Sequence, residues 1–580
     1  MAHLNDFLPR FATPRTELIL GVAAFVVTAV MLFSGLGSVP LMQPDEGRNA
    51  EIAREMAVTG SWLVPTLEGH PRLDKPAAYF VAVAVSLRVF GVNEWGARMP
   101  SALCGLAIIL LMYAFTRRQY EPVTAALSVI VIATSPMAFA FSRIVIVDNA
   151  LAVCTIAAIL AAFVAENGEV PDRRWHAAGA AAAGLGMLVK GPVGALVPAA
   201  VLVVFFLVDG RPRALRRVFA PVNSFLVLAL FVPWFAALVH AHPEFARYGL
   251  IEETFNRFFT PAFNRGQPFW YYGPMLLAAL FPWTVLFVPM AFAAWSNRSR
   301  LTRADRLFVV WTVVVIVFFS MSRTKQPGYI LTGVTAAAAC VGRGLGYAWH
   351  HREGFAARLV ARGALALAGV ALAVAAALGA SVARGAADPG RLAAMAAAPR
   401  SIWQVWPTLL IVLLAVAALA ASAYARRRSG LAVAAFALFP LALVTGLFPA
   451  VAGFASTRSA KALAESLASL PDRTEIACLE SYPAGLSFYL GRTLTIISED
   501  ATPLRSNFIN YWLHEIPVRP PTLVAPSGRD AWLETRETAA FILAPDRSRG
   551  DLEAWMGSRV PVRAAAPGWW GALVPSSTGQ

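Results

Sequence analysis

Long apolar runs separated by short polar loops make up most of the chain as far as residue 454. A helix needs about 20 apolar residues to cross the hydrocarbon core of a bilayer, and many of the runs approach or reach that length. Lys and Arg gather in short clusters between the runs, which is the pattern of cytoplasmic loops. The pattern predicts a polytopic α-helical membrane protein with roughly thirteen spans.

The distribution of Lys and Arg among the short loops also orients the spans. A first span over residues 18–36 leaves Arg10 and Arg15 in the cytoplasm and delivers Asp45 to the far side. The apolar segment 77–90 is short for a crossing helix, so we expect it to lie in the interface. This arrangement predicts a cytoplasmic N-terminus and a C-terminus on the opposite face.

The composition changes after Phe454, where short apolar runs alternate with turn residues. Strands are predicted at 475–479, 493–497, 522–524 and 541–543, and helices at 457–470, 483–490 and 530–537. We therefore expect a membrane domain over residues 1–454 and a small α/β domain on the outer face over residues 455–580.

Composition agrees with this division and excludes several other classes of protein. The chain is 58% hydrophobic and only 14% charged, which argues against a purely soluble protein. A net charge of +15 would suggest nucleic-acid binding in a soluble protein. Here the basic residues follow the loop pattern instead, so no nucleic-acid partner is expected. The four cysteines are scattered and form no disulfide framework or zinc pattern.

The predicted topology collects two acids on the outer face. Asp45 directly follows the first span, and Asp148 stands at the start of a later one. Acids so close to hydrocarbon are costly and commonly mark a functional site. Taken alone, Asp148 is equally well explained as an ordinary helix N-cap.

Several cations are predicted at the same level of the membrane: Lys75, Lys190, Arg265, Arg323 and Lys325. Cations there can simply anchor lipid headgroups. Two acids beside several bases also suit a reaction with a phosphate leaving group. Cations then stabilise charge on the departing phosphate while an acid orients or deprotonates the attacking group. The outer loop 243–268 either provides an aromatic interface belt or caps a lipid-binding cavity.

Six short motifs occur in order: Gln43-Pro44-Asp45-Glu46-Gly47-Arg48, Leu73-Asp74-Lys75-Pro76, Gly96-Ala97-Arg98-Met99-Pro100-Ser101, Lys190-Gly191-Pro192, Gln267-Pro268-Phe269-Trp270-Tyr271-Tyr272 and Lys325-Gln326-Pro327-Gly328-Tyr329-Ile330-Leu331. Together they resemble the bacterial lipid A aminoarabinose transferases, within the protein O-mannosyltransferase-like membrane glycosyltransferases. The resemblance covers about residues 15–335 and, more loosely, the tail.

The resemblance implies a GT-C fold of transmembrane helices with a small C-terminal periplasmic α/β domain. It implies that Asp45 and Asp148 are the catalytic acids, and that a polyprenyl-phosphate donor meets basic residues. Lys75 and Arg265 match those residues best, and Lys190 and Lys325 are further candidates. The remaining pocket residues implied are Glu46, Arg48, Asp74 and Tyr329.

Two positions depart from the family pattern, in which they have been associated with a bound metal. Asp74 stands where the aminoarabinose enzymes usually carry Glu, and Asn264 stands where a His is usual. No cofactor is therefore required by this interpretation, and a divalent metal is left open.

The implied function is an inner-membrane enzyme that moves a sugar, 4-amino-4-deoxy-L-arabinose, from undecaprenyl phosphate to lipid A on the periplasmic side. Displacement of the lipid phosphate in one step would invert the anomeric centre. Asp45 would be the base for a hydroxyl acceptor, or would position an acceptor that is already anionic. Two alternatives remain open: a related transferase acting on protein hydroxyls or another glycolipid, and a polyprenyl-lipid transporter without chemistry. We expect a monomer whose partners are the lipid donor, the glycolipid acceptor and membrane lipids.

Overall fold

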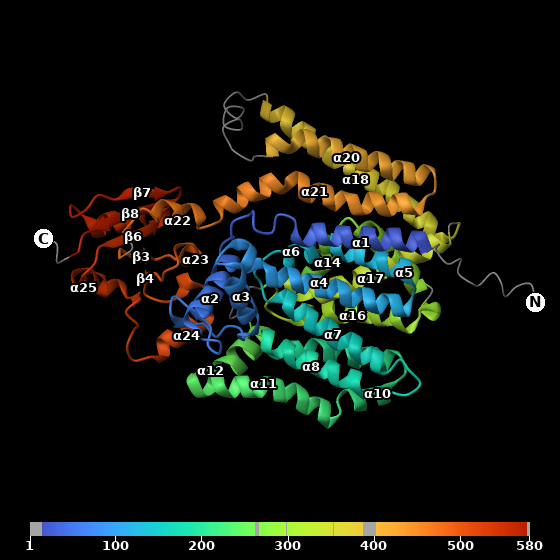
Figure 1. Ribbon diagram of the computed structural model, residues 1–580, viewed down its shortest axis with the longest axis horizontal. Coiled ribbons are helices and arrows are strands. Elements are labelled where there is room, and N and C mark those ends of the chain that lie inside the picture. The colour runs from blue at the N-terminus through green and yellow to red at the C-terminus, as the bar shows by residue number, and fades with distance from the viewer. Residues whose placement is uncertain are drawn as a thin grey trace, which may run out of the picture. The chain divides into compact units, whose positions relative to one another are not determined.

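The computed structural model describes residues 14–260, 266–296, 298–351, 353–386, 402–471 and 473–576. The described chain forms two compact units (Figure 1). The first unit comprises Met1–Leu36, Ser101–Val232 and Phe255–Gly453, and the second comprises Gly37–Pro100, Pro233–Thr254 and Phe454–Gln580.

The first unit is built from helices. Its principal elements are α1 (Pro14–Phe33), α4 (Glu94–Gln119), α5 (Pro122–Thr134), α6 (Pro136–Phe141), α7 (Asp148–Ala165), α8 (Arg173–Lys190), α9 (Val193–Val208), α10 (Pro212–Val218), α11 (Pro221–Ala241), α14 (Tyr272–Leu280), α15 (Thr284–Ser296), α16 (Arg303–Met321), η5 (Pro327–Ile330), α17 (Leu331–His350), α18 (Phe355–Ala386), α20 (Ile402–Ala425) and α21 (Ser429–Thr457). Helices α4, α11 and α21 continue into the second unit.

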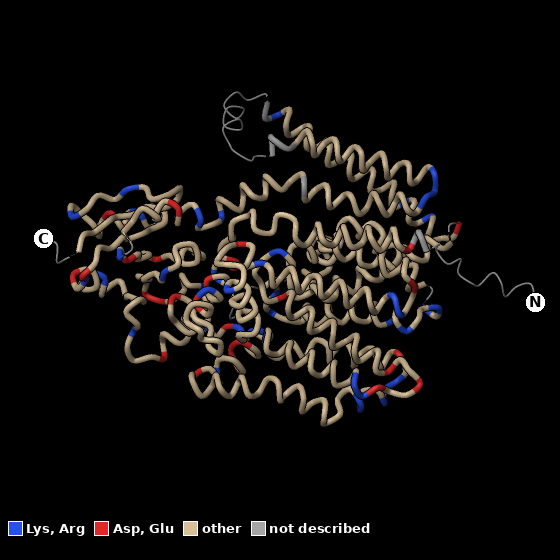
Figure 2. The backbone as a smooth tube through the Cα atoms, in the orientation of Figure 1, with Lys and Arg blue, Asp and Glu red and all other residues tan. Residues whose placement is uncertain are grey.

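Within the described residues, seven helices are long and apolar enough to cross a membrane, or up to eight if one bent pair forms a single span. Four further apolar helices are shorter, among them Ala78–Phe90. Charged residues are sparse along the helices of the first unit, and Lys and Arg gather where α10 lies (Figure 2). The chain is thus a multi-span membrane protein, and the count of roughly thirteen spans stays a prediction.

One long apolar run forms a bent pair of helices. The sequence pattern favours a continuous helix over residues 270–295, but α14 ends at Leu280 and α15 begins at Thr284, with a bend of 118° between them. Phe281 has an extended backbone (ψ 137°) and precedes Pro282. Proline disfavours helical geometry in the residue before it and lacks the N–H that would continue the helix.

Small residues bring α17 against α5 in the core of the first unit. A Cβ added at Gly342 would lie 2.3 Å from the Ser128 hydroxyl, and one at Gly346 would lie 1.8 Å from the Thr124 hydroxyl. Such close approach of two backbones is typical of helices packed in membranes, where association depends on van der Waals contact. This packing fixes α17, which follows directly on the Tyr329 turn.

The second unit combines outer-loop elements with the C-terminal tail. Its elements are α2 (Asp45–Thr59), β1 (Thr66–Leu67), β2 (His70–Pro71), α3 (Ala78–Phe90), α12 (Phe245–Arg247), η2 (Tyr248–Asn256), α22 (Lys461–Leu467), β3 (Glu475–Leu479), α23 (Leu486–Leu490), β4 (Thr495–Ile497), α24 (Asn507–Glu515), β5 (Leu523–Val524), α25 (Arg529–Glu534), β6 (Ala540–Pro545), α26 (Arg549–Met556), β7 (Arg563–Ala566) and β8 (Trp569–Val574). The domain limits 1–454 and 455–580 stay predictions.

The tail forms a six-stranded sheet in the order β5-β4-β3-β6-β8-β7. Strands β5, β4, β3 and β6 are parallel, whereas β8 and β7 are antiparallel additions. The four parallel strands were predicted because buried parallel strands give continuous apolar runs. The antiparallel pair was missed, as were α24 and α26. The expected small α/β domain is nevertheless confirmed.

Candidate active site

Asp148 and Lys190 form a buried ion pair in the first unit. Asp148 begins α7 and Lys190 ends α8, where Gly191 turns the chain with a positive φ of 80°. Lys190 Nζ donates a hydrogen bond of 2.6 Å to Asp148 Oδ1, and the two side chains are 8% and 6% exposed. The N-cap explanation of Asp148 is wrong, because the N-cap of α7 is Val147.

Tyr329 completes this group of side chains. The Lys190 ammonium lies 4.7 Å from the centre of the Tyr329 ring, within the range of a cation–π contact. The Tyr329 hydroxyl in turn accepts a hydrogen bond from Arg257 Nε at 3.3 Å. We call Asp148, Lys190, Tyr329 and Arg257 the Asp148 cluster. Sequence reasoning missed Arg257, whose only signal is its place in the long outer loop.

A glycine allows the Tyr329 turn to approach Asp148. A Cβ at Gly328 would lie 2.8 Å from Asp148 Cγ and 2.5 Å from the Phe141 ring. The same turn is fixed by Tyr272, whose hydroxyl donates to the Gln326 carbonyl at 3.0 Å and accepts from the Gln326 amide at 3.1 Å. The Lys-Gln-Pro-Gly-Tyr motif is therefore a tight backbone turn placed against the carboxylate.

Lys325 lies at the start of this turn. It is buried, and its ammonium donates to the Ser322 carbonyl at 2.5 Å. Burial, followed by the charge of Arg323, lowers the pKa of Lys325. Its predicted part in phosphate binding stays a prediction. Arg265 and Asn264 lie outside the described residues.

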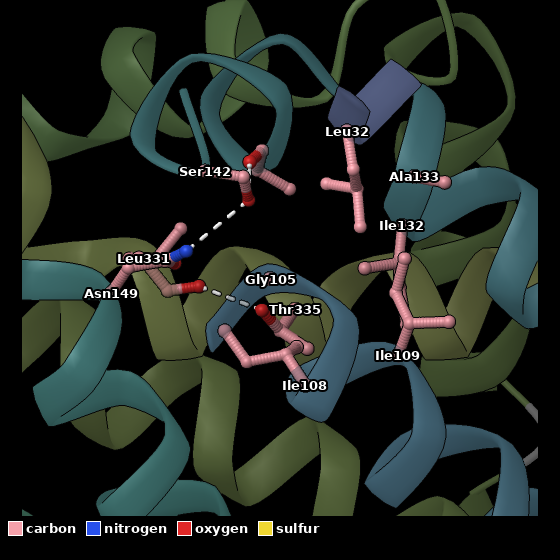
Figure 3. A pocket seen from close by; sticks show the side chains of 11 residues that line it. Leu32, Gly105, Ile108, Ile109, Ile132, Ala133, Ser142, Asn149, Leu331 and Thr335 are labelled. Carbon is pink, nitrogen blue, oxygen red and sulfur yellow. Dashed lines mark hydrogen bonds between the residues drawn. The ribbon is translucent and has the colours of Figure 1, made fainter. Parts of the chain in front are cut away.

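A small cavity lies in the first unit beside Asn149, the residue after Asp148 (Figure 3). Asn149 Nδ2 donates to the Ser101 carbonyl at 2.9 Å and to the Ser142 hydroxyl at 3.2 Å. The other lining residues are mostly apolar: Leu32, Gly105, Ile108, Ile109, Ile132, Ala133, Ala138, Leu331 and Thr335. The Asn149 contacts hold the start of α7, and with it Asp148.

The first motif of the chain begins α2 in the second unit. Asp45 is half exposed and accepts a hydrogen bond of 2.6 Å from Arg48 Nη2. Glu46 is buried and pairs with both Nε and Nη2 of Arg98, at 2.8 and 2.9 Å. Arg98 also donates to the Val39 carbonyl at 2.6 Å. Glu46 therefore fixes the entry to α2, whereas Asp45 presents its carboxylate at the surface of the unit.

Asp74 binds the start of α24. Its carboxylate accepts hydrogen bonds from the Ser506 hydroxyl at 2.5 Å, from the Asn507 amide at 2.9 Å and from the Tyr248 hydroxyl at 3.1 Å. Arg72 Nε lies 3.4 Å away. Burial would raise the pKa of Asp74, but Arg72, Ser506 and Lys75 together hold it below its ordinary value.

These contacts bear on the metal that the family pattern associates with this position. Both oxygens of Asp74 already accept hydrogen bonds, and an arginine beside them opposes a bound cation. In the part of the chain that the structure describes, no group of three His, Cys, Asp or Glu residues has a geometry that could hold a metal ion. The residues present at Asp74 do not fit a metal, and no step of the proposed reaction uses one.

Lys75 forms an ion pair with Glu253 of η2, and both side chains are mostly buried. Asp74, its neighbour in the chain, is bound instead to the start of α24. Sequence reasoning missed Glu253, although the same outer loop had been predicted to lie on this face. Leu73 packs with Leu238, Phe245, Tyr248 and Phe508 and so anchors the lysine's backbone.

Comparisons with known proteins agree with this picture. Residues 74–236 match the family model described as dolichyl-phosphate-mannose-protein mannosyltransferase. The undecaprenyl phosphate-alpha-4-amino-4-deoxy-L-arabinose arabinosyl transferase of Erwinia tasmaniensis is 30% identical over 295 residues, covering 50% of this chain and 53% of that protein. The enzyme of the same name from Photorhabdus laumondii is 30% identical over 313 residues, covering 53% and 55%. The chain thus spans about half the length of these curated relatives.

A solved structure extends the similarity in fold. The crystal structure of ArnT from Cupriavidus metallidurans bound to undecaprenyl phosphate matches with a TM-score of 0.77 and 23% identity, over 97% of this chain and 98% of that one. The apo structure matches with the same TM-score and 24% identity. The GT-C fold is thereby confirmed. The resemblance to the aminoarabinose transferases, predicted from six motifs, is confirmed by sequence over half of the chain and by fold over nearly all of it.

Proposed function

We propose that this chain transfers 4-amino-4-deoxy-L-arabinose from undecaprenyl phosphate to lipid A at the periplasmic face of the inner membrane. The observation that carries the proposal is the match to relatives that are named for this sugar and this lipid carrier. The family segment 74–236 also contains Lys75, Asp148 and Lys190, three of the residues to which we assign roles.

In the proposed reaction, an oxygen of the acceptor attacks the anomeric carbon of the sugar. The new carbon–oxygen bond forms as the bond to the carrier phosphate breaks, and the electron pair leaves with undecaprenyl phosphate. The anomeric centre is inverted. Cations that meet the departing phosphate stabilise its growing charge, and such electrostatic stabilisation commonly contributes more to catalysis than any other single effect.

We assign the donor phosphate to Lys75, whose side chain is mostly buried and paired with Glu253. Burying an ammonium group without a carboxylate partner carries a large desolvation penalty. The ion pair with Glu253 therefore allows Lys75 to remain charged in a mostly buried position. Arg265, Lys325 and Lys190 are further candidates for the same charge. Asp45, half exposed and oriented by Arg48, is assigned to the acceptor or to the amino group of the sugar.

The test is transfer by purified protein in proteoliposomes, with undecaprenyl phosphate-aminoarabinose as donor and lipid A as acceptor. We expect aminoarabinose-modified lipid A from the unaltered chain and none from Asp45→Asn, which keeps the shape of the side chain and removes its charge. Donor binding without transfer to any acceptor would favour the transporter alternative.

A second candidate acceptor comes from the family model. Residues 74–236 match a model named for protein mannosyltransferases, so a polyprenyl-phosphate mannose donor and a Ser/Thr-rich peptide belong in the same assay. Transfer to the peptide in place of lipid A would favour this candidate.

The proposed orientation places the N-terminus in the cytoplasm and the C-terminal domain in the periplasm. Ser527 and Ser299 are both exposed, and they lie on opposite predicted faces. In a cysteine-free background, Ser527→Cys should react with an impermeant thiol reagent applied from the periplasm, whereas Ser299→Cys should not. The reverse labelling pattern would invert the topology.

A further inference from the structure

Two buried arginines of the second unit converge on the turn that precedes α24. Arg48 lies on α2 and is 7% exposed, and Arg72 follows β2 and is 5% exposed. Arg48 Nη1 donates to the Arg505 carbonyl at 3.0 Å. Arg72 Nε lies 3.4 Å from Asp74, which itself accepts from the hydroxyl of Ser506. Arg48 therefore contacts the Arg505–Ser506 turn directly, and Arg72 is linked to it through Asp74.

The carboxylates around this pair do not use all of its hydrogen-bond donors. Within the described residues, Arg48 Nε and Arg72 Nε and Nη1 are buried without a hydrogen-bond partner. The oxygens of Asp74 are already shared among two hydroxyls and two backbone amides, and Asp45 accepts from Arg48 Nη2. Buried polar groups normally find partners, and an arginine cannot lose its charge to avoid the need for one.

Two other buried arginines of the same unit provide an internal comparison. Arg98 forms a two-point contact with Glu46 at 2.8 and 2.9 Å. Arg54 forms one with Glu51, at 2.7 Å for each bond. Each of these arginines has a carboxylate that matches its planar fork, whereas Arg72 meets Asp74 through one long contact of 3.4 Å. Arg98 and Arg54 are therefore paired differently from Arg72.

We propose that Arg48 and Arg72 form an anion site for the phosphate group of a lipid substrate, separate from Lys75. The inference rests on the proposed function, which brings two kinds of lipid phosphate to this protein, one on the carrier and one on lipid A. Guanidinium forks bind phosphate oxygens in pairs, with geometric specificity that an ammonium lacks. The charge of each arginine also opposes that of the other, and a bound dianion relieves this repulsion.

The experiment measures binding without turnover, by native mass spectrometry of the full chain in nanodiscs. The probes are diphosphoryl lipid A and undecaprenyl phosphate, with undecaprenol as the phosphate-free control. Arg72→Gln and Arg48→Gln should each weaken binding of one of the two phosphate lipids at least ten-fold, and the lipid affected identifies the source of the phosphate. Arg547→Gln, an exposed change in the same unit, should change neither affinity.

Arg72→Lys keeps the positive charge beside Asp74 but lacks the planar guanidinium group, so it should bind the phosphate lipid with intermediate affinity. It also keeps the site testable if Arg72→Gln does not fold. Unchanged affinity of Arg72→Gln and Arg72→Lys for both phosphate lipids would overturn the site. Failure of the proposed function would be a different result: the chain would bind the lipids through these arginines but would not transfer sugar.

Discussion

Lys190 Nζ lies 2.6 Å from Asp148 Oδ1, and both side chains are buried at the ends of neighbouring helices. The carboxylate is thus paired with a cation before any substrate arrives. This favours a role for Asp148 in holding Lys190, with Tyr329 beneath the ammonium, over a role as a free base. If Asp148 and Lys190 act through this one contact, loss of either side chain should reduce turnover to a similar extent.

A double-mutant cycle tests that coupling. Asp148→Asn and Lys190→Ala should each cut turnover strongly, and the double variant should be no worse than the poorer single one, because coupled residues are not additive. Breaking a buried pair costs about 3–5 kcal/mol of stability, so thermal unfolding is measured alongside. Glu169→Gln removes an exposed charge of the same unit and should change neither. Additive losses of turnover would contradict a shared role.

Gly328→Ala tests the closeness of the Tyr329 turn to the same carboxylate. The added Cβ would lie 2.8 Å from Asp148 Cγ, so either the turn or Asp148 must move. We expect turnover to fall at least ten-fold while the protein still inserts and purifies. The matched control is Gly273→Ala, where an added Cβ meets nothing within 4 Å. Equal activity of the two variants would show that the turn tolerates the shift.

Lys75→Ala should weaken binding of undecaprenyl phosphate by roughly one to two orders of magnitude, since a charge-assisted contact contributes about 1.5–3 kcal/mol. Lys75→Arg should recover only part of the affinity, because a planar fork replaces a point charge. The control is Lys461→Ala, which removes a half-exposed ammonium paired with Glu94 in the same unit. Full affinity in Lys75→Ala, measured by titration of purified protein, would place the phosphate elsewhere, with Lys325 and Arg265 next to be changed.

The free energy that stabilises the packing of Glu68 against the C-terminal tail should fall as the pH rises. Burial, followed by the charge of Glu55, raises the pKa of Glu68 from 4.5 to about 7, and Glu68 accepts a hydrogen bond from the Leu494 amide at 2.7 Å. A carboxyl with a raised pKa in the folded chain stabilises that state fully below 4.5, and the contribution is lost as the pH rises through about 7. The loss amounts to about 3 kcal/mol at most.

Hydrogen exchange of the Leu494 amide, corrected for the intrinsic rate, measures this effect between pH 6.5 and 8.5. His70 opposes this slope only near the lower end of that window, because burial lowers its pKa from 6.5 to about 4 and its effect is complete about one pH unit above the ordinary value. Glu68→Gln should reduce the loss of protection, and Glu537→Gln, an exposed change, should not. Protection that is independent of pH in the unaltered chain would contradict the argument.

The sequence predicted several residues of the candidate site but not the side chains that they contact. Short motifs carry Lys190 and Tyr329, and the start of a predicted span carries Asp148, because backbone turns and helix ends need particular residues at fixed spacing. The partners Glu253 and Arg257 come from a loop without a motif, and such long-range pairings depend on packing that no local pattern encodes. The pairing of Asp74 with the start of α24 was unpredictable for the same reason, since 432 positions separate Asp74 from Ser506.

The fold was predictable where the pattern is strong and local. Continuous apolar runs gave the membrane helices and the parallel strands β3 to β6, because burial on all sides needs such runs. Strand β7 is largely exposed and rich in alanine, so it carries no strand signal. The break between α14 and α15 was missed because a single proline interrupts the helix within an otherwise continuous apolar run.

The most direct test of the central claim is mass spectrometry of lipid A from cells with and without this protein, supplied with the aminoarabinose carrier lipid. The account predicts lipid A carrying aminoarabinose only when the intact chain is present, and unmodified lipid A when Asp45→Asn replaces it. Identical lipid A in all three strains, with the protein present in the membrane, would contradict the account.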